Sequence, residues 1–176
     1  MSETIILVFR DLITSPDETI KSHAELIKYY GYCWWGWWKK PIENVPIGLF
    51  ERVLSIKAKI YLFDCGQYLN KRTSGDNYFY VADTDDYFIS STDAGVPSPD
   101  INKTPSYYSD RRFIVWFKFT SISGISEDVI KGHKYIDFPT WPNTAYDSYN
   151  GKYISGADEL DEMRVTLWHI ERNGAR

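Results

Sequence analysis

The sequence predicts a mixed α+β domain with more strand than helix. A β-branched apolar run from Thr4 to Arg10 indicates a central strand. Residues 112–120 (RFIVWFKFT) alternate with a period of two, which is typical of a strand covered on both faces. Helical spacing of apolar residues occurs in only two segments, at residues 15–30 and 44–55. The length of 176 residues favours a single domain spanning residues 1–176.

The first helix has clear start and stop signals. Ser15 can cap it, Pro16 suits its first position, and Glu18 completes a capping box. Residues 20, 24 and 27 then share one face. Gly31 is placed to end the helix, because glycine readily adopts the left-handed conformation of a C-terminal cap.

The next elements follow from changes in period. Residues 44–55 predict a second helix with Pro46 near its start and one apolar stripe. From residue 59 the period falls to two, which predicts strands over 60–63 and 77–82, joined through a turn at 73–76. Residues 164–170 predict a final strand. Two long segments, 90–110 and 138–157, show no periodicity and are expected to be loops.

Composition excludes several classes of protein. The longest apolar runs fall well short of a membrane span, and the N-terminus lacks the basic region of a signal peptide, so we expect a cytoplasmic protein that does not enter the membrane. Cys33 and Cys65 are expected to be free thiols. A net charge of −4 opposes nonspecific binding to a phosphate backbone, so any nucleic-acid role must be confined to a pocket.

The most informative feature is a run of tryptophans in a chain that is 17% aromatic. In an extended segment Trp34 faces one side and Trp35 and Trp37 face the other, so the four rings of Trp34, Trp35, Trp37 and Trp38 cannot all enter one core. Indole rings stack on bases and sugars and attract cations. The run therefore indicates an aromatic cage around a ligand, with core and lid packing as the alternative.

Further candidates for this pocket lie elsewhere in the chain. Trp116 and Trp141 can supply additional walls, and Asn143 can read a hydrogen-bonding edge. Lys39, next to the tryptophans, can meet a phosphate, although a solvated side chain is the alternative. Turn formation is the alternative for Asn143.

No motif points to a metal or a nucleophile. Asp83-Thr84-Asp85-Asp86 lacks the further ligands of a calcium loop and is expected to be a solvated turn. The cysteines and histidines show no zinc or nucleophile-elbow spacing, and the sequence contains no glycine-rich phosphate loop. We therefore expect no cofactor and no catalytic residues.

The order of the predicted elements resembles that of PUA-like domains, and within them the EVE and YTH branch. The order is a strand, a capped helix, the Trp-bearing segment, a second helix and then paired strands around residues 60–63 and 78–82. This resemblance implies a small, mostly β-barrel fold with two or three flanking helices. It also implies a pocket in which aromatic side chains hold a modified base extruded from nucleic acid. Only the proximity of residues 34–38 to that pocket is carried over to this chain.

Three functions are compatible with these features. The first is non-enzymatic recognition of a modified nucleobase or nucleotide, free or flipped out of single-stranded DNA or RNA, as a sensor coupled to an effector domain or protein. The second is a module that binds a carbohydrate or a methylated cation. The third, from the resemblance to ASCH relatives, is a small hydrolase of modified nucleosides, with Lys39, Lys118, Tyr61 or Glu51 as reagents.

Overall fold

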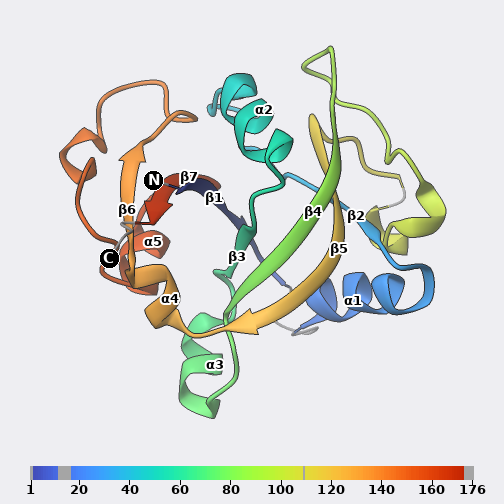
Figure 1. Ribbon diagram of the computed structural model, residues 1–176, viewed down its shortest axis with the longest axis horizontal. Helices are drawn as coiled ribbons and strands as arrows, with labels where there is room; N and C mark the ends of the chain where they lie inside the picture. The colour runs from blue at the N-terminus through green and yellow to red at the C-terminus, as the bar shows by residue number, and fades with distance from the viewer. Residues whose placement is uncertain (1, 12–16, 109, 173–176) are drawn as a thin grey trace.

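The computed structural model describes residues 2–11, 17–108 and 110–172, which form one continuous seven-stranded sheet with helices on both faces (Figure 1). The strand order is β2-β5-β4-β3-β1-β7-β6. The strands are β1 (Ser2–Phe9), β2 (Cys33–Gly36), β3 (Ile60–Asp64), β4 (Phe79–Ile89), β5 (Val115–Ile125), β6 (His133–Asp137) and β7 (Leu167–Arg172).

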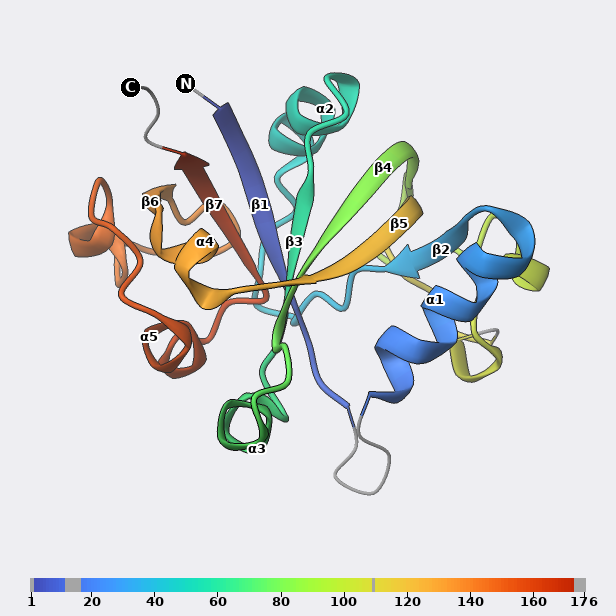
Figure 2. The ribbon, with the colours of Figure 1, turned by 60° about the horizontal axis from the view of Figure 1, so that its bottom comes forward.

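Strand β1 lies in the middle of the sheet between β3 and β7. It pairs in parallel with β3, with Leu7 opposite Leu62, and antiparallel with β7, with Ile6 opposite Trp168. The other neighbouring strands pair antiparallel. Figure 2 shows how strongly the strands twist across the sheet. Because a parallel pair needs a crossover, the chain segment between β1 and β3 carries α1, β2 and α2.

Five α-helices occur among the described residues: α1 (Glu18–Tyr30), α2 (Ile47–Ser55), α3 (Tyr68–Ser74), α4 (Glu127–Lys131) and α5 (Ala157–Glu162). Helix α1 ends at Gly31, as predicted, with φ of 87° and the Gly31 N–H donating to the Ile27 carbonyl. Asp17 precedes α1, whereas Ser15 and Pro16 of the expected capping box lie outside the described residues.

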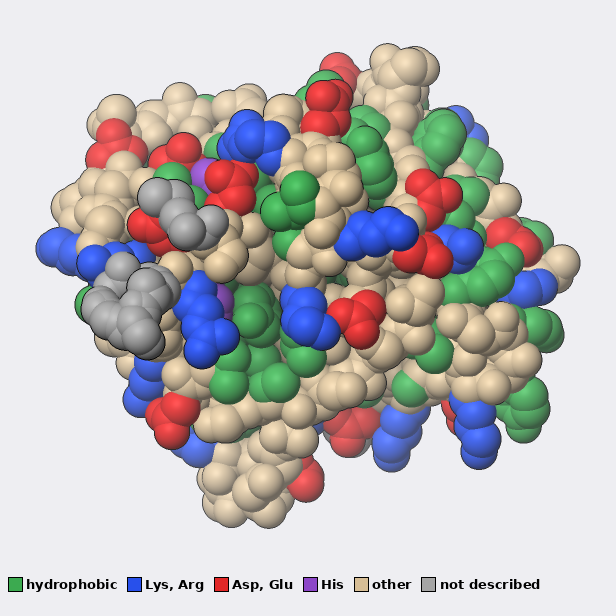
Figure 3. Space-filling view, viewed as in Figure 1, with side chains coloured by type: hydrophobic (Ala, Val, Ile, Leu, Met, Phe, Trp, Pro, Cys, Tyr) green, Lys and Arg blue, Asp and Glu red, His purple; other side chains and the backbone are tan. Residues whose placement is uncertain are grey.

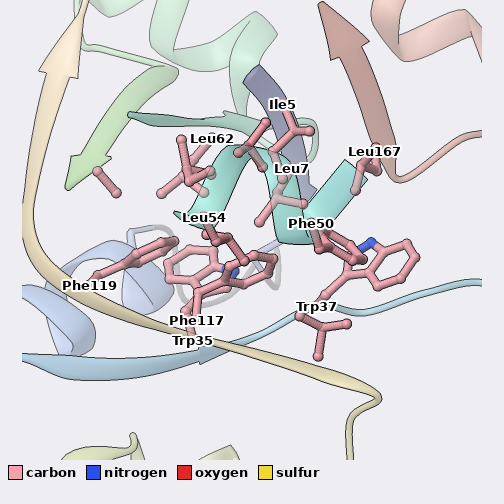
Figure 4. Close-up of a cluster of buried hydrophobic side chains, with 14 of the residues drawn as sticks. Ile5, Leu7, Trp35, Trp37, Phe50, Leu54, Leu62, Phe117, Phe119 and Leu167 are labelled. Atoms are coloured by element: carbon pink, nitrogen blue, oxygen red, sulfur yellow. The ribbon is translucent and has the colours of Figure 1, made fainter. Parts of the chain in front are cut away.

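The two faces of the sheet carry separate apolar clusters because alternate residues of each strand point to opposite sides. Ile5 and Leu7 of β1 join a cluster covered by α1 and α2, whereas Ile6 joins one covered by α3, α4 and α5. Figure 4 shows the first cluster, in which Trp35 and Trp37 point toward Phe50 and Phe117. Part of the aromatic run is therefore core.

The predicted fold class, mixed α+β with mostly strand, is confirmed, but two details differ. The hydrogen-bonded order has edges at β2 and β6, so the sheet does not close into a complete barrel. The described part of the chain forms five α-helices rather than two or three. The additional ones, α3, α4 and α5, have five to seven residues each, too short to show a helical period in the sequence.

The acidic segment Asp83-Thr84-Asp85-Asp86 is not the expected turn. It lies within β4, where the pairing with β5 shifts register between Asp83 and Asp86. Asp83 there binds Lys59 at 2.8 Å and Ser121 at 2.7 Å. A register shift interrupts the alternation of side chains along the strand, so this segment lacks the period of two that marks a strand in sequence.

The two long loops have little regular structure. Among the described residues of 90–114 there are two short 3₁₀ turns and a bridge from Val96 to Phe113. Residues 138–156 contain the 3₁₀ turn Asp147–Tyr149 and a bridge from Tyr153 to Lys134. On the face seen in Figure 3 acidic and basic side chains are intermingled. Among the helices of the described residues, none combines the length and apolar character needed to cross a membrane.

Candidate ligand-binding cavity

A cavity of about 600 Å³ opens where the C-terminal ends of β1 and β2 meet the start of α1. The loop residues Tyr107, Tyr108 and Arg111 and several residues between 160 and 168 complete its wall. We call it the first cavity; its lining includes Phe9, Arg10, Asp11, Glu18, Thr19, Trp35, Trp38, Lys40, Cys65, Tyr107, Tyr108, Arg111, Asp161 and Trp168. Its size lies within the range of about 300 to 1,000 Å³ typical of small-molecule sites.

The aromatic rings that line the first cavity differ in their exposure to solvent. Trp35 is 2% exposed and is held by edge contact with Phe9, at a centroid distance of 5.4 Å. Trp38 is 50% exposed and lies 6.2 Å from the ring of Tyr108. The cavity therefore combines a fixed ring with one that a ligand can reach from solvent.

A buried histidine supports the fixed ring from behind. The His23 imidazole lies 4.4 Å from the Trp35 ring, measured between centroids, and its Nδ1 lies 2.7 Å from the Thr19 carbonyl oxygen. Complete burial lowers the pKa of His23 to about 4, although hydrogen bonds to the backbone at Thr19 and Trp34 oppose the shift. His23 is therefore neutral at pH 7, where it packs as an aromatic ring.

The lining of the first cavity includes the Asp11 carboxylate, which organises the start of α1. Oδ1 of Asp11 accepts hydrogen bonds from the backbone N–H of Thr19, at 2.9 Å, and from its hydroxyl. This takes the place of an N-terminal cap, since Asp17 makes no side-chain capping bond. Oδ2 of Asp11 is buried and has no hydrogen-bond partner within the described part of the chain.

Charged groups of both signs surround the opening. Arg10, Lys40 and Arg111 line the cavity and are exposed, and none of them forms an ion pair with a described carboxylate. The Arg111 guanidinium instead lies over the Trp38 ring, 5.1 Å from its centroid. Glu18 and Asp161 are exposed acidic lining residues. The opening thus offers anchors to a ligand with separate apolar and charged parts.

A buried glutamate holds the segment that carries Trp38. Glu43 Oε1 accepts from the Lys40 N–H at 3.0 Å and from the Thr166 hydroxyl at 2.6 Å. Glu43 Oε2 accepts from the Thr140 hydroxyl at 2.7 Å and from the Thr166 N–H at 2.9 Å. The Glu43 carboxylate thus accepts four hydrogen bonds, and these connect the segment after β2 to the chain just before β7.

A second cavity, of about 700 Å³, adjoins the first. Trp38 and Arg111 line both cavities and so form the wall between them. The remaining lining of the second cavity consists of Trp37, Lys39, Pro41, Glu43, Asn44, Val45, Asp93, Ala94, Arg112, Phe113 and Ile114.

The tryptophan run is divided among three environments. Trp35 and Trp38 line the first cavity, and Trp37 lines the second while packing in the core at 5.4 Å from Phe50. Trp34 packs on the opposite side of β2 with Trp116, as the alternation of strand side chains predicts. Trp116 is fully buried, and its indole N–H donates to the Val96 carbonyl. Neither Trp34 nor Trp116 lines either cavity.

The other predicted site residues lie apart from the first cavity. Trp141 packs on Tyr146 at the apolar cluster that α3, α4 and α5 cover. The exposed Asn143 accepts a hydrogen bond from the Ala145 N–H, which is a contact within a turn. Lys39 lines the second cavity and donates to the Glu43 carbonyl at 2.8 Å. These assignments to a ligand site remain predictions.

Sequence reasoning missed several lining residues, notably Asp11, Tyr108 and Arg111. Asp11 comes just after the first predicted strand, and a polar residue at the end of a strand was the signal that could have identified it. Tyr108 and Arg111 belong to a loop without periodicity, so only the folded chain brings them to the cavity. Cys65 is also a lining residue; both cysteines are free thiols, as predicted.

Taken together, the observations describe a mostly β domain with an aromatic cavity of mixed charge. A family model described as Pua-like matches residues 5–175, so the chain belongs to the Pua-like family. Modules of this family generally bind RNA or modified nucleotides. No curated protein and no solved structure matched the chain in the corresponding searches.

Proposed function

We propose that this protein recognises a modified nucleobase or nucleotide in the first cavity without catalysing a reaction, as a cytoplasmic sensor module coupled to an effector. The observation that carries the proposal is the pairing of the fixed Trp35 ring with the accessible Trp38 ring at one cavity. Stacking on aromatic rings contributes about 1 to 3 kcal/mol per base and does not depend on an extended basic surface. This suits a chain with a net charge of −4.

Membership of the Pua-like family supports a nucleic-acid ligand, and the cavity supports a single base. A base removed from its stack needs a closely fitting pocket with aromatic walls and a few polar groups at its edge. The side chains of Asp11, Thr19 and Tyr108 supply polar groups beside the rings.

The test is a titration with modified and unmodified nucleosides, nucleotides and short single strands, followed by tryptophan fluorescence. Trp38 is the most exposed of the tryptophans, so a base stacked on it quenches its emission directly. We expect saturable quenching by one modified base, lost in Trp38→Ala. Tyr29→Ala is the matched control, since Tyr29 is 78% exposed and lines neither cavity.

A methylated cation is the second candidate, and the acidic lining favours it. Asp11, Glu18 and Asp161 lie at the same cavity as the rings, and a cation over an indole face is stabilised by about 0.5 to 2 kcal/mol. Quenching by methylated ammonium ligands or glycans, with no response to any nucleotide, would favour this class.

The hydrolase alternative has less support from the arrangement of its expected reagents. Lys118 lies over the ring of Tyr32, Tyr61 packs edge-on against His133, and Glu51 is exposed on α2. None of these three lines either cavity. Turnover of a modified nucleoside would nevertheless establish this function directly.

A further inference from the structure

The two cavities share a wall made of side chains that a ligand can contact from both sides. Trp38 and Arg111 line both volumes, of about 600 and 700 Å³, and both residues are exposed. They lie against each other, with the guanidinium 5.1 Å from the indole centroid. A ligand confined to the first cavity therefore leaves the adjoining, similarly sized volume unfilled.

Cations gather along this shared wall. Arg111 lines both cavities, Lys40 lines the first, and Lys39 and Arg112 line the second. Within the described ranges none of the four forms an ion pair with a carboxylate. The Lys39 ammonium already donates to the Glu43 carbonyl, and the Arg112 guanidinium donates to the Gly95 carbonyl. Arg111, which lines both cavities, is therefore the cation best placed for a ligand anion, and a guanidinium binds phosphate oxygens in a matching planar geometry.

The acidic groups of the second cavity oppose this charge only partly. Glu43 is buried, and both of its carboxylate oxygens are engaged by donors from the chain itself. Asp93 is the other acidic lining residue. The second cavity thus has three cationic lining residues, Lys39, Arg111 and Arg112, and one carboxylate free of the Glu43 network.

We infer that the ligand is a nucleic-acid strand of at least two nucleotides that spans both cavities. This inference rests on the proposed function. The recognised base occupies the first cavity, the adjoining nucleotide enters the second, and Arg111 binds the phosphodiester between them. Trp38 then separates the two nucleotides, with a base on the face that is not covered by Arg111.

The experiment compares four ligands built on the nucleoside that quenches most strongly: the nucleoside, its 5′- and 3′-monophosphates, and a dinucleotide containing it. We expect the dinucleotide to bind at least about tenfold more tightly than the nucleoside and more tightly than either monophosphate, as a charge-assisted contact plus a second nucleotide requires. In Arg111→Gln the affinity for the dinucleotide should fall by more than the affinity for the nucleoside, so that the ratio of the two affinities falls toward one.

Salt dependence provides an independent readout. For a hexanucleotide, the slope of log affinity against log salt should fall by about 0.7 in magnitude in Arg111→Gln, the amount expected for one lost phosphate contact to a single strand. Lys152→Gln is the matched control, because Lys152 is exposed and lines neither cavity. Thermal unfolding of both variants verifies that they are folded.

The outcomes separate the inference from the proposed function. If the nucleoside binds and the dinucleotide binds no more tightly, or if a monophosphate accounts for the whole gain, the two-cavity strand is wrong while base recognition stands. An unchanged dinucleotide advantage in Arg111→Gln overturns the role of Arg111. If no nucleoside, nucleotide or strand quenches, the proposed function itself fails.

Discussion

The indole N–H of Trp37 donates a hydrogen bond to the hydroxyl of Thr166, 3.0 Å away. The same hydroxyl donates to Glu43, so Trp37 is both an apolar core residue and a member of a buried polar network. The adjacent Trp38 has neither role and is half exposed. Neighbouring tryptophans in one run therefore have different roles, one in stability and one at the candidate site.

Replacing Trp37 by alanine should affect stability, whereas replacing Trp38 by alanine should affect ligand binding. Trp37→Ala removes a ring that is 2% exposed together with the donor to Thr166, so we expect a loss of about 3 to 5 kcal/mol in the free energy of unfolding. Trp38→Ala should change stability by less than about 1 kcal/mol and abolish ligand quenching. Chemical denaturation and the nucleoside titration measure the two effects. A stable Trp37→Ala protein would contradict the core assignment.

Glu43→Gln should destabilise the fold by about 2 to 3 kcal/mol. The substitution replaces one acceptor oxygen with an N–H₂ group that faces donors, because both carboxylate oxygens receive hydrogen bonds. Glu51→Gln, on the exposed side of α2, is the matched control and should be nearly neutral. Urea denaturation of the two variants decides the point, and equal stabilities would show that the Glu43 network adds nothing.

His23 should make the protein less stable in mild acid. Its folded pKa of about 4 lies below the ordinary value of 6.5, so the unfolded chain binds the proton more strongly. Its contribution is complete above pH 6.5 and is lost as the pH falls toward 4, by about 3 kcal/mol in total.

Denaturation at several pH values between 4 and 7 tests this, with His23→Gln as the variant. The variant should show a shallower fall in stability over that range. Burial also lowers the pKa of His133, so part of the slope remains in the variant. A slope identical to that of the unmodified protein would rule out His23 as its source.

Cys65 should report on occupancy of the first cavity. It lines that cavity and is partly exposed, whereas Cys33 is buried in the core with its pKa raised to about 12 by burial. Burial also raises the pKa of Cys65, so its alkylation at neutral pH should be slow but measurable.

Mass spectrometry after alkylation should find modification at Cys65 first, and a bound nucleoside should slow it. Cys33→Ser and Cys65→Ser variants assign the reacting thiol. If ligand saturates the fluorescence change while leaving the rate at Cys65 unaltered, the ligand does not occupy the first cavity.

The regular elements were largely predictable because each carries its own local signal. The strand at Thr4, the helix ended by Gly31 and the alternation through residues 115–119 all follow from periodicity and caps. The short helices α3, α4 and α5 and the strand β6 were missed, since a few residues cannot establish a period. Tertiary contacts define those elements.

The candidate site was only half predictable for the same reason. Alternation correctly separated Trp34 from Trp35 and Trp37, because strand geometry alone decides which side each ring faces. It could not show that Trp38 shares the first cavity with Trp35, because Trp38 follows β2 in an irregular segment where the alternation no longer applies. Arg111 reaches Trp38 only through the path of a long loop, and no local pattern encodes that path.

The position of β1 between β3 and β7 has a consequence for how the chain acquires its structure. Ile6 pairs with Trp168, so one side of the central strand stays unpaired until nearly all of the domain has left the ribosome. Contacts this distant in sequence close late and slow folding. The first cavity draws lining from β1 and from residues 160–168, so its formation should coincide with the final pairing step. A nascent chain stalled before β7 should therefore be unable to bind the ligand.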